Sequence, residues 1–354
     1  MLQETGHPKM KILITGASGF IGSHMADHAV RQGHDTWAAI RPTSDRSILQ
    51  APSLRHIILN LEDAELLTTQ LEAHRAHYGR WDVVIHCAGA TKCRHAHEFG
   101  QINYGGTRHL VDTLMRLDMV PQQFILISTL GIYGPLHEEE PYLPFTEADT
   151  PRPNTLYGES KYRAEEYVKG IAALPYVIFR PTGVYGPRDK DYQLLIRSIR
   201  AHIDLSLGRR PQRVTFVYVK DLVEAVFMAI DKEVQRRSYL VTDGHTYSSS
   251  DFTRVVRAAL GNPFTLHLTI PLWMGRMVAH LADIAGRLCG RTFTFNSDKY
   301  RILAQRNWQC DITPLTEELD YHPQYNLEAG IAETLKIDEN DYEDGNKQKI
   351  MSLF

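Results

Sequence analysis

The chain has 354 residues, a length that suits one large domain or two closely joined ones. Its content of 43% hydrophobic and 23% charged residues is typical of a globular protein with a sizeable core and excludes bulk disorder. The 39 basic and 42 acidic residues are mixed along the sequence and give a net charge of -3. We therefore expect no nucleic-acid partner.

The cysteines and the N-terminus bear on the compartment. Cys87, Cys93, Cys289 and Cys310 form no CxxC pair, which indicates a reducing compartment, and we expect a cytoplasmic protein. Residues 1-9 contain no apolar run that would indicate a signal peptide or an N-terminal anchor, and we expect them to be flexible.

From Lys11 to Thr182, short β-rich runs alternate with helix-like stretches, which is the pattern of βαβ units. The predicted fold class is α/β, with a doubly wound parallel sheet (Rossmann) of six or seven strands over residues 10-180. The clearest strands, each apolar enough to be buried on both faces, are Lys11–Thr15, Thr36–Ile40, His56–Leu59, Val83–Cys87, Phe124–Ser128 and Tyr176–Arg180.

Residues 181-336 are expected to form a smaller C-terminal substrate-binding part that is interleaved with the sheet. Within it, residues 214-242 return to the sheet through a strand at Val214–Val219, a helix at Asp221–Ile230 and a strand at Tyr239–Thr242. Pro263–Glu333 is a candidate cap over the substrate. The acidic residues 337-354 are expected to be a disordered tail.

Three glycines follow the first strand in the sequence ILITGASGFIGSH. Gly16 permits a tight turn, Gly19 lets the backbone approach a pyrophosphate, and Gly22 allows a helix to pack closely on the sheet. The N-terminus of that helix offers free N–H groups and a partial positive charge to the phosphates. The pattern predicts a dinucleotide site, to which the same loop also contributes Ser18, Phe20 and Ile21.

Arg41 follows the second strand, where NAD enzymes of this fold often have an acidic residue that binds the ribose 2′-hydroxyl. A guanidinium instead pairs with a 2′-phosphate through charge-assisted hydrogen bonds. We therefore expect NADP(H) in preference to NAD(H). The alternative is NAD(H) with Arg41 as a solvated side chain beside Pro42.

The GxxGxxG spacing within TGASGFIG resembles the extended short-chain dehydrogenase/reductase (NAD-dependent epimerase/dehydratase) family, and the likeness runs to about Gly330. The cap is nearer the 3-beta-hydroxysteroid dehydrogenase and flavonol reductase branch than the sugar branch. The resemblance implies that Asn60 and Leu61 lie near the adenine. It also places further cofactor contacts at Cys87, Ala88, Gly89, Pro181, Thr182, Gly183 and Val184.

Tyr157 and Lys161 are four residues apart, on one face of a helix if the residues from Leu156 onward are helical. A ketone that accepts hydride needs a proton from a positioned acid, which tyrosine can supply. A free phenol has a pKa of about 10, so acting near neutrality takes about 4 kcal/mol of phenolate stabilisation, from Lys161 and the oxidised nicotinamide.

The resemblance implies that Lys161 also binds the nicotinamide ribose. It further implies that Thr129 polarises the substrate oxygen and that Asn103 supports the site.

A cluster of histidines and cysteines could suggest a metal site. Cys93, His95 and His97, joined by His86 and Cys87, lack the paired spacing of a metal motif. We expect no metal.

Two departures from the family pattern bear on the substrate. Leu130 and Gly131 replace the Asp-Glu pair that follows the catalytic threonine in sugar 4,6-dehydratases. Val214 stands where nucleotide-sugar epimerases often have an arginine that pairs with the diphosphate, and strand alternation turns Arg213 to the opposite face. We expect hydride transfer to or from a ketone or secondary alcohol on a hydrophobic or lipid-like molecule. The alternatives are a nucleotide-sugar epimerase with tightly bound NAD and a non-catalytic dinucleotide-binding sensor.

The segment Ile270–Arg291 can form a helix with one apolar face. We expect this face to pack against the core of the cap, and the alternatives are an apolar substrate pocket or contact with a membrane surface. Its polar interruptions exclude a transmembrane span. The expected partner is therefore a small-molecule substrate, with peripheral membrane contact and a homodimer left open.

Overall fold

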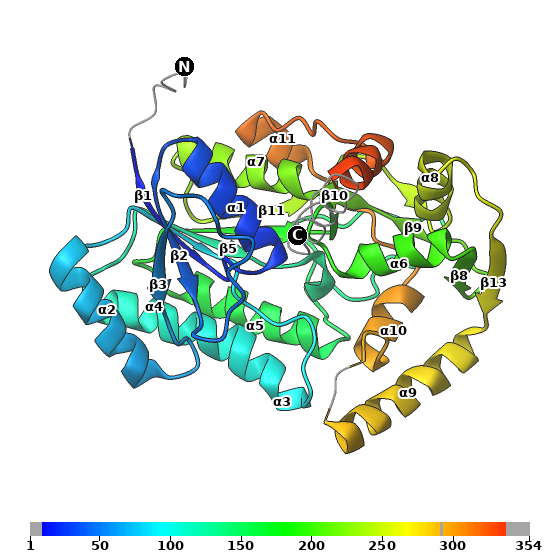
Figure 1. The fold of residues 1–354 in the computed structure, drawn as a ribbon, viewed down its shortest axis with the longest axis horizontal. Helices are drawn as coiled ribbons and strands as arrows, with labels where there is room; N and C mark the ends of the chain where they lie inside the picture. The colour runs from blue at the N-terminus through cyan, green and yellow to red at the C-terminus, as the bar shows by residue number, and fades with distance from the viewer. Residues whose placement is uncertain (1–8, 291–292, 338–354) are drawn as a thin grey trace, which may run out of the picture.

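The computed structural model describes residues 9–290 and 293–337, so most of the expected N-terminal and C-terminal tails lies outside the described residues. At its centre is a parallel sheet of seven strands in the order β11-β6-β5-β4-β1-β2-β3 (Figure 1). The expected doubly wound sheet is confirmed. Its strands are β1 (Lys11–Thr15), β2 (Asp35–Ile40), β3 (Arg55–Ile58), β4 (Val83–His86), β5 (Gln123–Ile127), β6 (Tyr176–Pro181) and β11 (Arg237–Val241).

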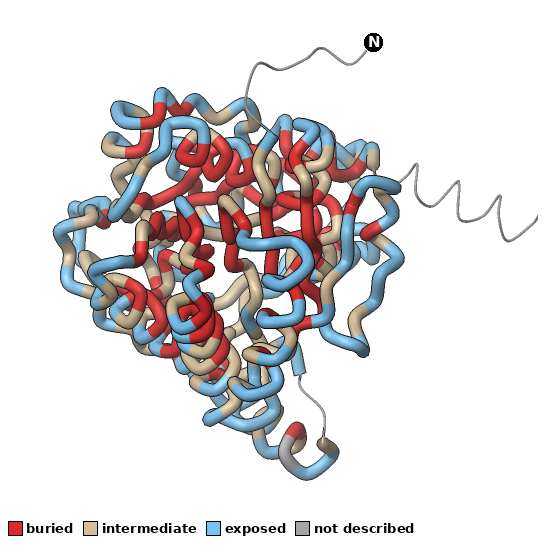
Figure 2. Tube along the Cα trace, turned by 90° about the vertical axis from the view of Figure 1, so that its left-hand side faces the viewer, coloured by how far each residue is buried: buried red, intermediate tan, exposed pale blue. Residues whose placement is uncertain are grey.

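Helices cover both faces of the sheet, and alternate residues of each inner strand feed two separate cores (Figures 1 and 2). On β1, for example, Ile12 and Ile14 pack into one core and Leu13 into the other. The first core is completed by α1 (Phe20–Arg31), α7 (Val219–Asp231) and α11 (Thr313–Leu319). The second is completed by α2 (Ala64–Tyr78), α4 (Gly106–Arg116) and α5 (Leu156–Gly170).

Strand β3 departs from the expectation that every strand is buried on both faces. Arg55 and His56 are exposed, and the side chain of Ile58 is 44% exposed. The reason is topological, because β3 is the edge strand and pairs only with β2 within the sheet.

Beyond β6 the chain forms three two-stranded sheets. They pair β7 (Gly183–Tyr185) with β10 (Phe216–Tyr218), β9 (Arg213–Val214) with β12 (Tyr247–Ser248), and β8 (Ile203–Leu207) with β13 (Leu266–Ile270). The single strand expected at Val214–Val219 is therefore divided into β9 and β10, and neither joins the central sheet. Thr215 lies at the break, where its hydroxyl donates to the carbonyl of Trp308 at 2.6 Å. Helices α6 (Asp191–Arg200), α8 (Asp251–Ala259) and residues 327–337 pack around these strands.

The cap helices are α9 (Leu272–Cys289) and α10 (Ser297–Ala304), and α9 extends along the lower right edge in Figure 1. The expectation that the apolar face of α9 packs against the cap core is wrong, because Trp273 is 67% exposed and Leu281 55% exposed. The buried side of α9 instead carries the small residues Gly275 and Ala279. Across residues 9–290 and 293–337, no helix has both the length and the apolar character needed to cross a membrane.

Candidate active site

The glycine loop after β1 has the geometry of a phosphate cradle. Gly16 has a φ of +66°, and a Cβ on it would lie 2.7 Å from the backbone nitrogen of Ala88. A Cβ on Gly22 would lie 2.2 Å from the carbonyl oxygen of Gly16. Both positions therefore require glycine if the loop is to pack against β4 and α1.

The N-terminus of α1 is open to a ligand. Gly19 is the N-cap residue, no side chain caps the helix, and the first turn holds no acidic residue. The free N–H groups and the helix dipole therefore remain available to a pyrophosphate. These residues fit a dinucleotide.

The other expected cofactor residues line the same edge of the sheet. Arg41, Asn60 and Cys87 each lie just beyond the carboxyl end of a strand, namely β2, β3 and β4. Those strands and β1 are neighbours in the sheet, so the residues that follow them lie along one crevice. Arg41 is exposed, and its backbone N–H donates to Oγ of Ser44 at 3.0 Å.

Helix α5 brings the expected catalytic residues together. The hydroxyl of Tyr157 interacts with the side chain of Thr129, which begins the short helix at Leu130–Ile132. Burial raises the pKa of Tyr157 to about 12, which is opposite in direction to the phenolate stabilisation expected from the sequence. One turn further on, Nζ of Lys161 donates to the carbonyl of Ile127 at 2.6 Å, and burial lowers the pKa of Lys161 to about 8.

A buried chain of hydrogen bonds, not foreseen from the sequence, runs behind the site. Oγ1 of Thr15 lies 2.7 Å from Nδ1 of His86, and Nε2 of His86 lies 3.0 Å from Oγ1 of Thr107. Thr107 donates its own proton to the carbonyl of Asn103 at 2.6 Å, so it accepts from His86. His86 therefore carries its proton on Nε2 and accepts from Thr15. Burial lowers the pKa of His86 to about 3, which keeps this ring neutral.

Asn103 joins this chain to the catalytic helix. It is fully buried within a π-helix at Gly100–Gly105, a rare form that is frequent at functional sites. Its amide accepts from the N–H of Ala90 at 2.7 Å and donates to Oγ of Ser160 at 2.8 Å. Ser160 in turn donates to the carbonyl of Tyr157 at 2.7 Å. Asn103 therefore links the turn at Ala90 to helix α5.

Asp298 of the cap also reaches the catalytic helix, a contact that sequence reasoning missed. Its carboxylate accepts the backbone N–H of Tyr157 at 3.2 Å across 141 residues of sequence. Beside it, Lys299 and Lys92 both donate to the carboxylate of Asp191, at 3.0 and 2.6 Å. The bond of Asp298 holds α10 against the N-terminus of α5, and the bonds to Asp191 join α10 to the start of α6 and to Lys92 in the loop after β4.

An ion pair lies one turn beyond Lys161 on the buried face of α5. Nη2 of Arg180 and Oε2 of Glu165 are 2.7 Å apart, and the two side chains are 4% and 0% exposed. Nη1 of Arg180 also donates to the hydroxyl of Tyr133 at 2.9 Å. The carboxylate of Glu165 opposes the desolvation of Lys161 and favours its charged form.

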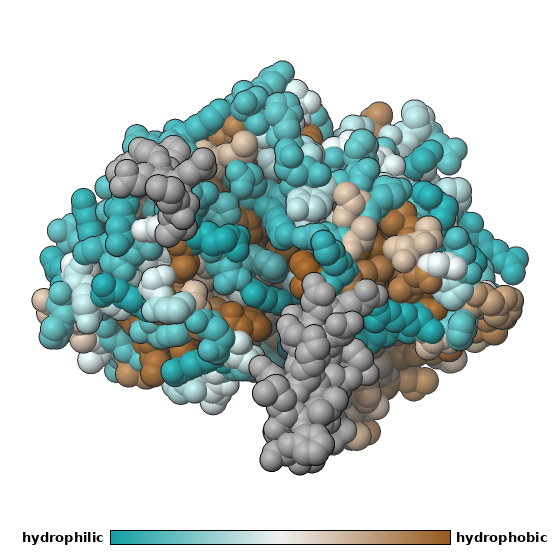
Figure 3. Space-filling view, turned by 45° about the horizontal axis from the view of Figure 1, so that its top comes forward, coloured by the Kyte–Doolittle hydropathy of each residue, from teal (hydrophilic) through white to brown (hydrophobic). Residues whose placement is uncertain are grey.

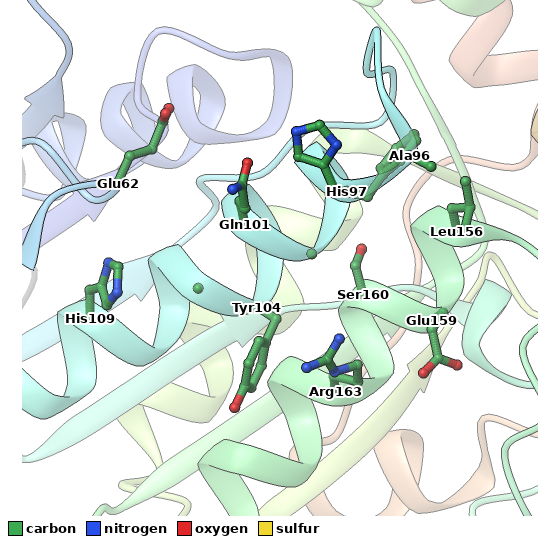
Figure 4. A pocket seen from close by; sticks show the side chains of 13 residues that line it. Glu62, Ala96, His97, Gln101, Tyr104, His109, Leu156, Glu159, Ser160 and Arg163 are labelled. Atoms are coloured by element: carbon green, nitrogen blue, oxygen red, sulfur yellow. The ribbon is translucent and has the colours of Figure 1, made fainter.

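A surface pocket lies on the opposite side of α5 (Figure 4). From α5 it is lined by the exposed residues Leu156, Glu159 and Arg163 and by the buried Ser160, whereas Tyr157 and Lys161 do not line it. The guanidinium carbon of Arg163 lies 4.4 Å from the ring centroid of Tyr104 across this pocket. The pocket thus lies beside the hydrogen-bond chain of the site, which it meets at Ser160.

Sheet order, glycine cradle and the Tyr157/Lys161 helix define an oxidoreductase of the extended short-chain dehydrogenase/reductase class. The chain belongs to the NAD dependent epimerase/dehydratase family, whose sequence model matches residues 12–242. It is 28% identical over 357 residues to UDP-glucose 4-epimerase of Vibrio cholerae, covering 93% of this chain and 96% of that protein.

Two other likenesses are informative. The chain is 25% identical over 272 residues to a 3 beta-hydroxysteroid dehydrogenase/Delta 5-->4-isomerase of Mycobacterium tuberculosis, covering 71% of this chain and 70% of that protein. The crystal structure of UDP-glucose 4-epimerase with UDP-glucose from Thermotoga maritima superposes with a TM-score of 0.75 at 22% identity, covering 94% of this chain and all of that one. This last likeness shows the shared fold.

Replacing Thr107 with valine should destabilise the protein. The variant keeps the shape of the side chain but leaves the Nε2 proton of the buried His86 without its acceptor, which costs about 1–3 kcal/mol of unfolding free energy. Urea unfolding measures the loss. Thr69→Val is the matched control, since Thr69 makes the same bond to the carbonyl four residues earlier on an exposed helix position. Equal losses in the two variants would contradict the bridging role of His86.

Proposed function

We propose that the chain transfers hydride between NADP(H) and a ketone or secondary alcohol on a hydrophobic or lipid-like molecule. The observation that carries this proposal is the placement of the Tyr157 hydroxyl against Thr129, one helical turn from the buried Lys161. A bound dinucleotide would supply or accept the hydride, and the glycine cradle and Lys161 would hold it.

In the direction of reduction, Tyr157 donates its proton to the substrate oxygen as charge develops there, and Thr129 orients that oxygen. The raised pKa of Tyr157, about 12, keeps the phenol protonated at neutral pH. The ammonium of Lys161 favours the phenolate that is left behind. Because the pKa of Lys161 is about 8, this charge is present below that pH and is lost as the pH rises above it.

The charges near the site support an apolar substrate over a nucleotide sugar. Val214 packs against a hydrophobic cluster, while Arg213 is exposed. Lys92 and Lys299, which join the cap to the site, are already paired with Asp191. They therefore attract a diphosphate less than free cations would. The likeness to the mycobacterial steroid dehydrogenase points in the same direction.

Nucleotide-sugar epimerisation with bound NAD is the second candidate. The observation that favours it is the likeness to the Vibrio cholerae epimerase, which extends over 93% of this chain. A cytoplasmic homodimer belongs to both proposals. The cysteine pattern supports the location, and the family resemblance supports the dimer.

Tyr157→Phe should lower turnover by roughly 10²–10⁴-fold, because the variant keeps the ring but loses the proton donor. Dinucleotide binding, followed by fluorescence of the reduced cofactor, should change little. Tyr162→Phe on the same helix is the control, with a half-buried ring outside the site. Unchanged turnover in Tyr157→Phe would refute the assignment.

A substrate panel separates the two candidate functions. We expect purified protein with NADPH to consume the reduced cofactor in the presence of long-chain or polycyclic ketones, measured by absorbance. UDP- and GDP-sugars should give neither cofactor consumption nor an epimer detectable by chromatography. Epimer formation without net cofactor change would establish the second candidate instead.

Arg41→Ala should weaken NADPH binding by about ten- to a hundredfold and leave NADH binding nearly unchanged, because a charge-assisted bond to the 2′-phosphate is lost. Titration calorimetry of both cofactors measures the two affinities. Arg75→Ala, an exposed arginine on α2, is the control. An NADPH preference that survives in Arg41→Ala would show that other groups distinguish the ribose 2′-phosphate from the 2′-hydroxyl.

A further inference from the structure

An ordinary surface helix buries its large apolar residues, but helix α9 exposes them and buries small residues instead. Trp273, Met277, Leu281, Ile284 and Leu288 recur at spacings of three and four residues and so form one stripe. Every one of them is exposed, from 41% for Ile284 to 82% for Leu288. The buried positions hold Gly275, Ala279 and Gly286 instead.

Small residues on its inner side allow α9 to pack closely against β8 and α10. A Cβ on Gly275 would lie 2.5 Å from Cδ1 of Leu207 on β8 and 3.5 Å from the ring of Tyr300 on α10. The helix is therefore held by its glycine side, and its apolar stripe faces outward as a consequence of close packing.

The ribbon formed by β8 and β13 continues the same arrangement. Their register pairs Ile203 with Leu266 and Leu205 with Leu268, so one face of the ribbon is apolar. These four side chains are 40% to 53% exposed. The opposite face is polar and bonds inward, since Asp204 accepts from Thr253 of α8 at 3.1 Å. We call the ribbon side chains and the α9 stripe together the apolar face; Figure 3 shows brown surface on the side where these elements lie.

Positive charge accompanies the apolar face. Residues 200–210 and 263–290 contain five arginines and two aspartates, an excess of three positive charges in a chain whose net charge is -3. Arg209, Arg210 and Arg276 are exposed. Both aspartates are hydrogen-bonded within the protein. Asp204 bonds to Thr253 and His267, and Asp283 accepts from the backbone N–H of Ser297.

We propose that the apolar face docks on an anionic membrane surface. A bulky apolar stripe with a tryptophan, flanked by arginines on a helix too polar to span, is suited to the boundary between headgroups and acyl chains. A second copy of the chain that met the same face would bring a second excess of positive charge to the interface, which disfavours it. The proposal does not depend on the reaction catalysed.

Docking would bring the membrane close to the active site. Tyr300, which contacts the glycine side of α9, lies on α10, and α10 supplies Asp298 to the N–H of Tyr157. The apolar face and the cap thus belong to one packed unit. A membrane-resident ketone or alcohol could reach the crevice from that side.

The first test is co-sedimentation of the full chain with vesicles of phosphatidylcholine alone or with about a third phosphatidylglycerol. We expect binding to the anionic vesicles that weakens with salt. Leu281→Glu should lower the partition coefficient by about tenfold or more, and Arg276→Glu by about fivefold or more. Leu66→Glu and Arg80→Glu, at exposed positions on α2 and just after it, at the opposite end of the molecule from α9 in Figure 1, should leave it unchanged.

Tryptophan emission gives a second readout that needs no variant of the apolar face. Of the four tryptophans, Trp37 and Trp81 are buried and Trp308 is half-buried, while Trp273 is 67% exposed. Anionic vesicles should shift the emission to the blue, and brominated lipids should quench it. Trp273→Phe should remove both effects while the protein still sediments with vesicles.

Two results would overturn the proposal. One is equal vesicle binding by Leu281→Glu, Arg276→Glu and the wild type, or no binding at all. The other is a dimer, seen by light scattering, that hides Trp273 without lipid and is broken by Leu281→Glu. Turnover of a water-soluble ketone, measured separately, should be the same in Leu281→Glu and the wild type. Failure to bind vesicles is thereby distinguished from failure of the catalytic proposal.

Discussion

The active site depends on one buried side chain, His86, which joins parts of the fold that the backbone leaves separate. Its ring links Thr15 at the end of β1 to Thr107 on α4, and through Asn103 and Ser160 the chain of bonds ends at the carbonyl of Tyr157. A neutral imidazole has one donor and one acceptor, so every bond in this chain has a fixed direction. The phosphate cradle and the catalytic helix are thereby held at a fixed separation.

Features encoded by local spacing were predictable from the sequence. The glycines of the cradle follow a buried strand at the required intervals, and Tyr157 and Lys161 are one helical turn apart. Short apolar runs predict parallel strands. A run such as that around Ile58 does not, however, show whether its strand is central or at the edge of the sheet. Strand order, which made β3 an edge, depends on contacts far apart in the sequence.

Features that depend on distant contacts were not predictable. Nothing near His86 distinguishes it from an ordinary core histidine, and Asp298 is separated from Tyr157 by 141 residues. The sequence of α9 shows an apolar stripe and a row of small residues, but periodicity alone does not tell which one faces the protein. The orientation of α9 depends on the space beside Leu207, where only a residue as small as Gly275 fits.

The bond between Asp298 and the N–H of Tyr157 has a consequence for how substrate size affects the reaction. Helix α10 and helix α5, which carries Tyr157, share this bond, so a displacement of α10 deprives the first turn of α5 of an acceptor. Under the proposed function, a substrate bulky enough to displace α10 would then bind and yet react slowly. Selectivity in such an enzyme is expressed in the rate of the chemical step as well as in affinity.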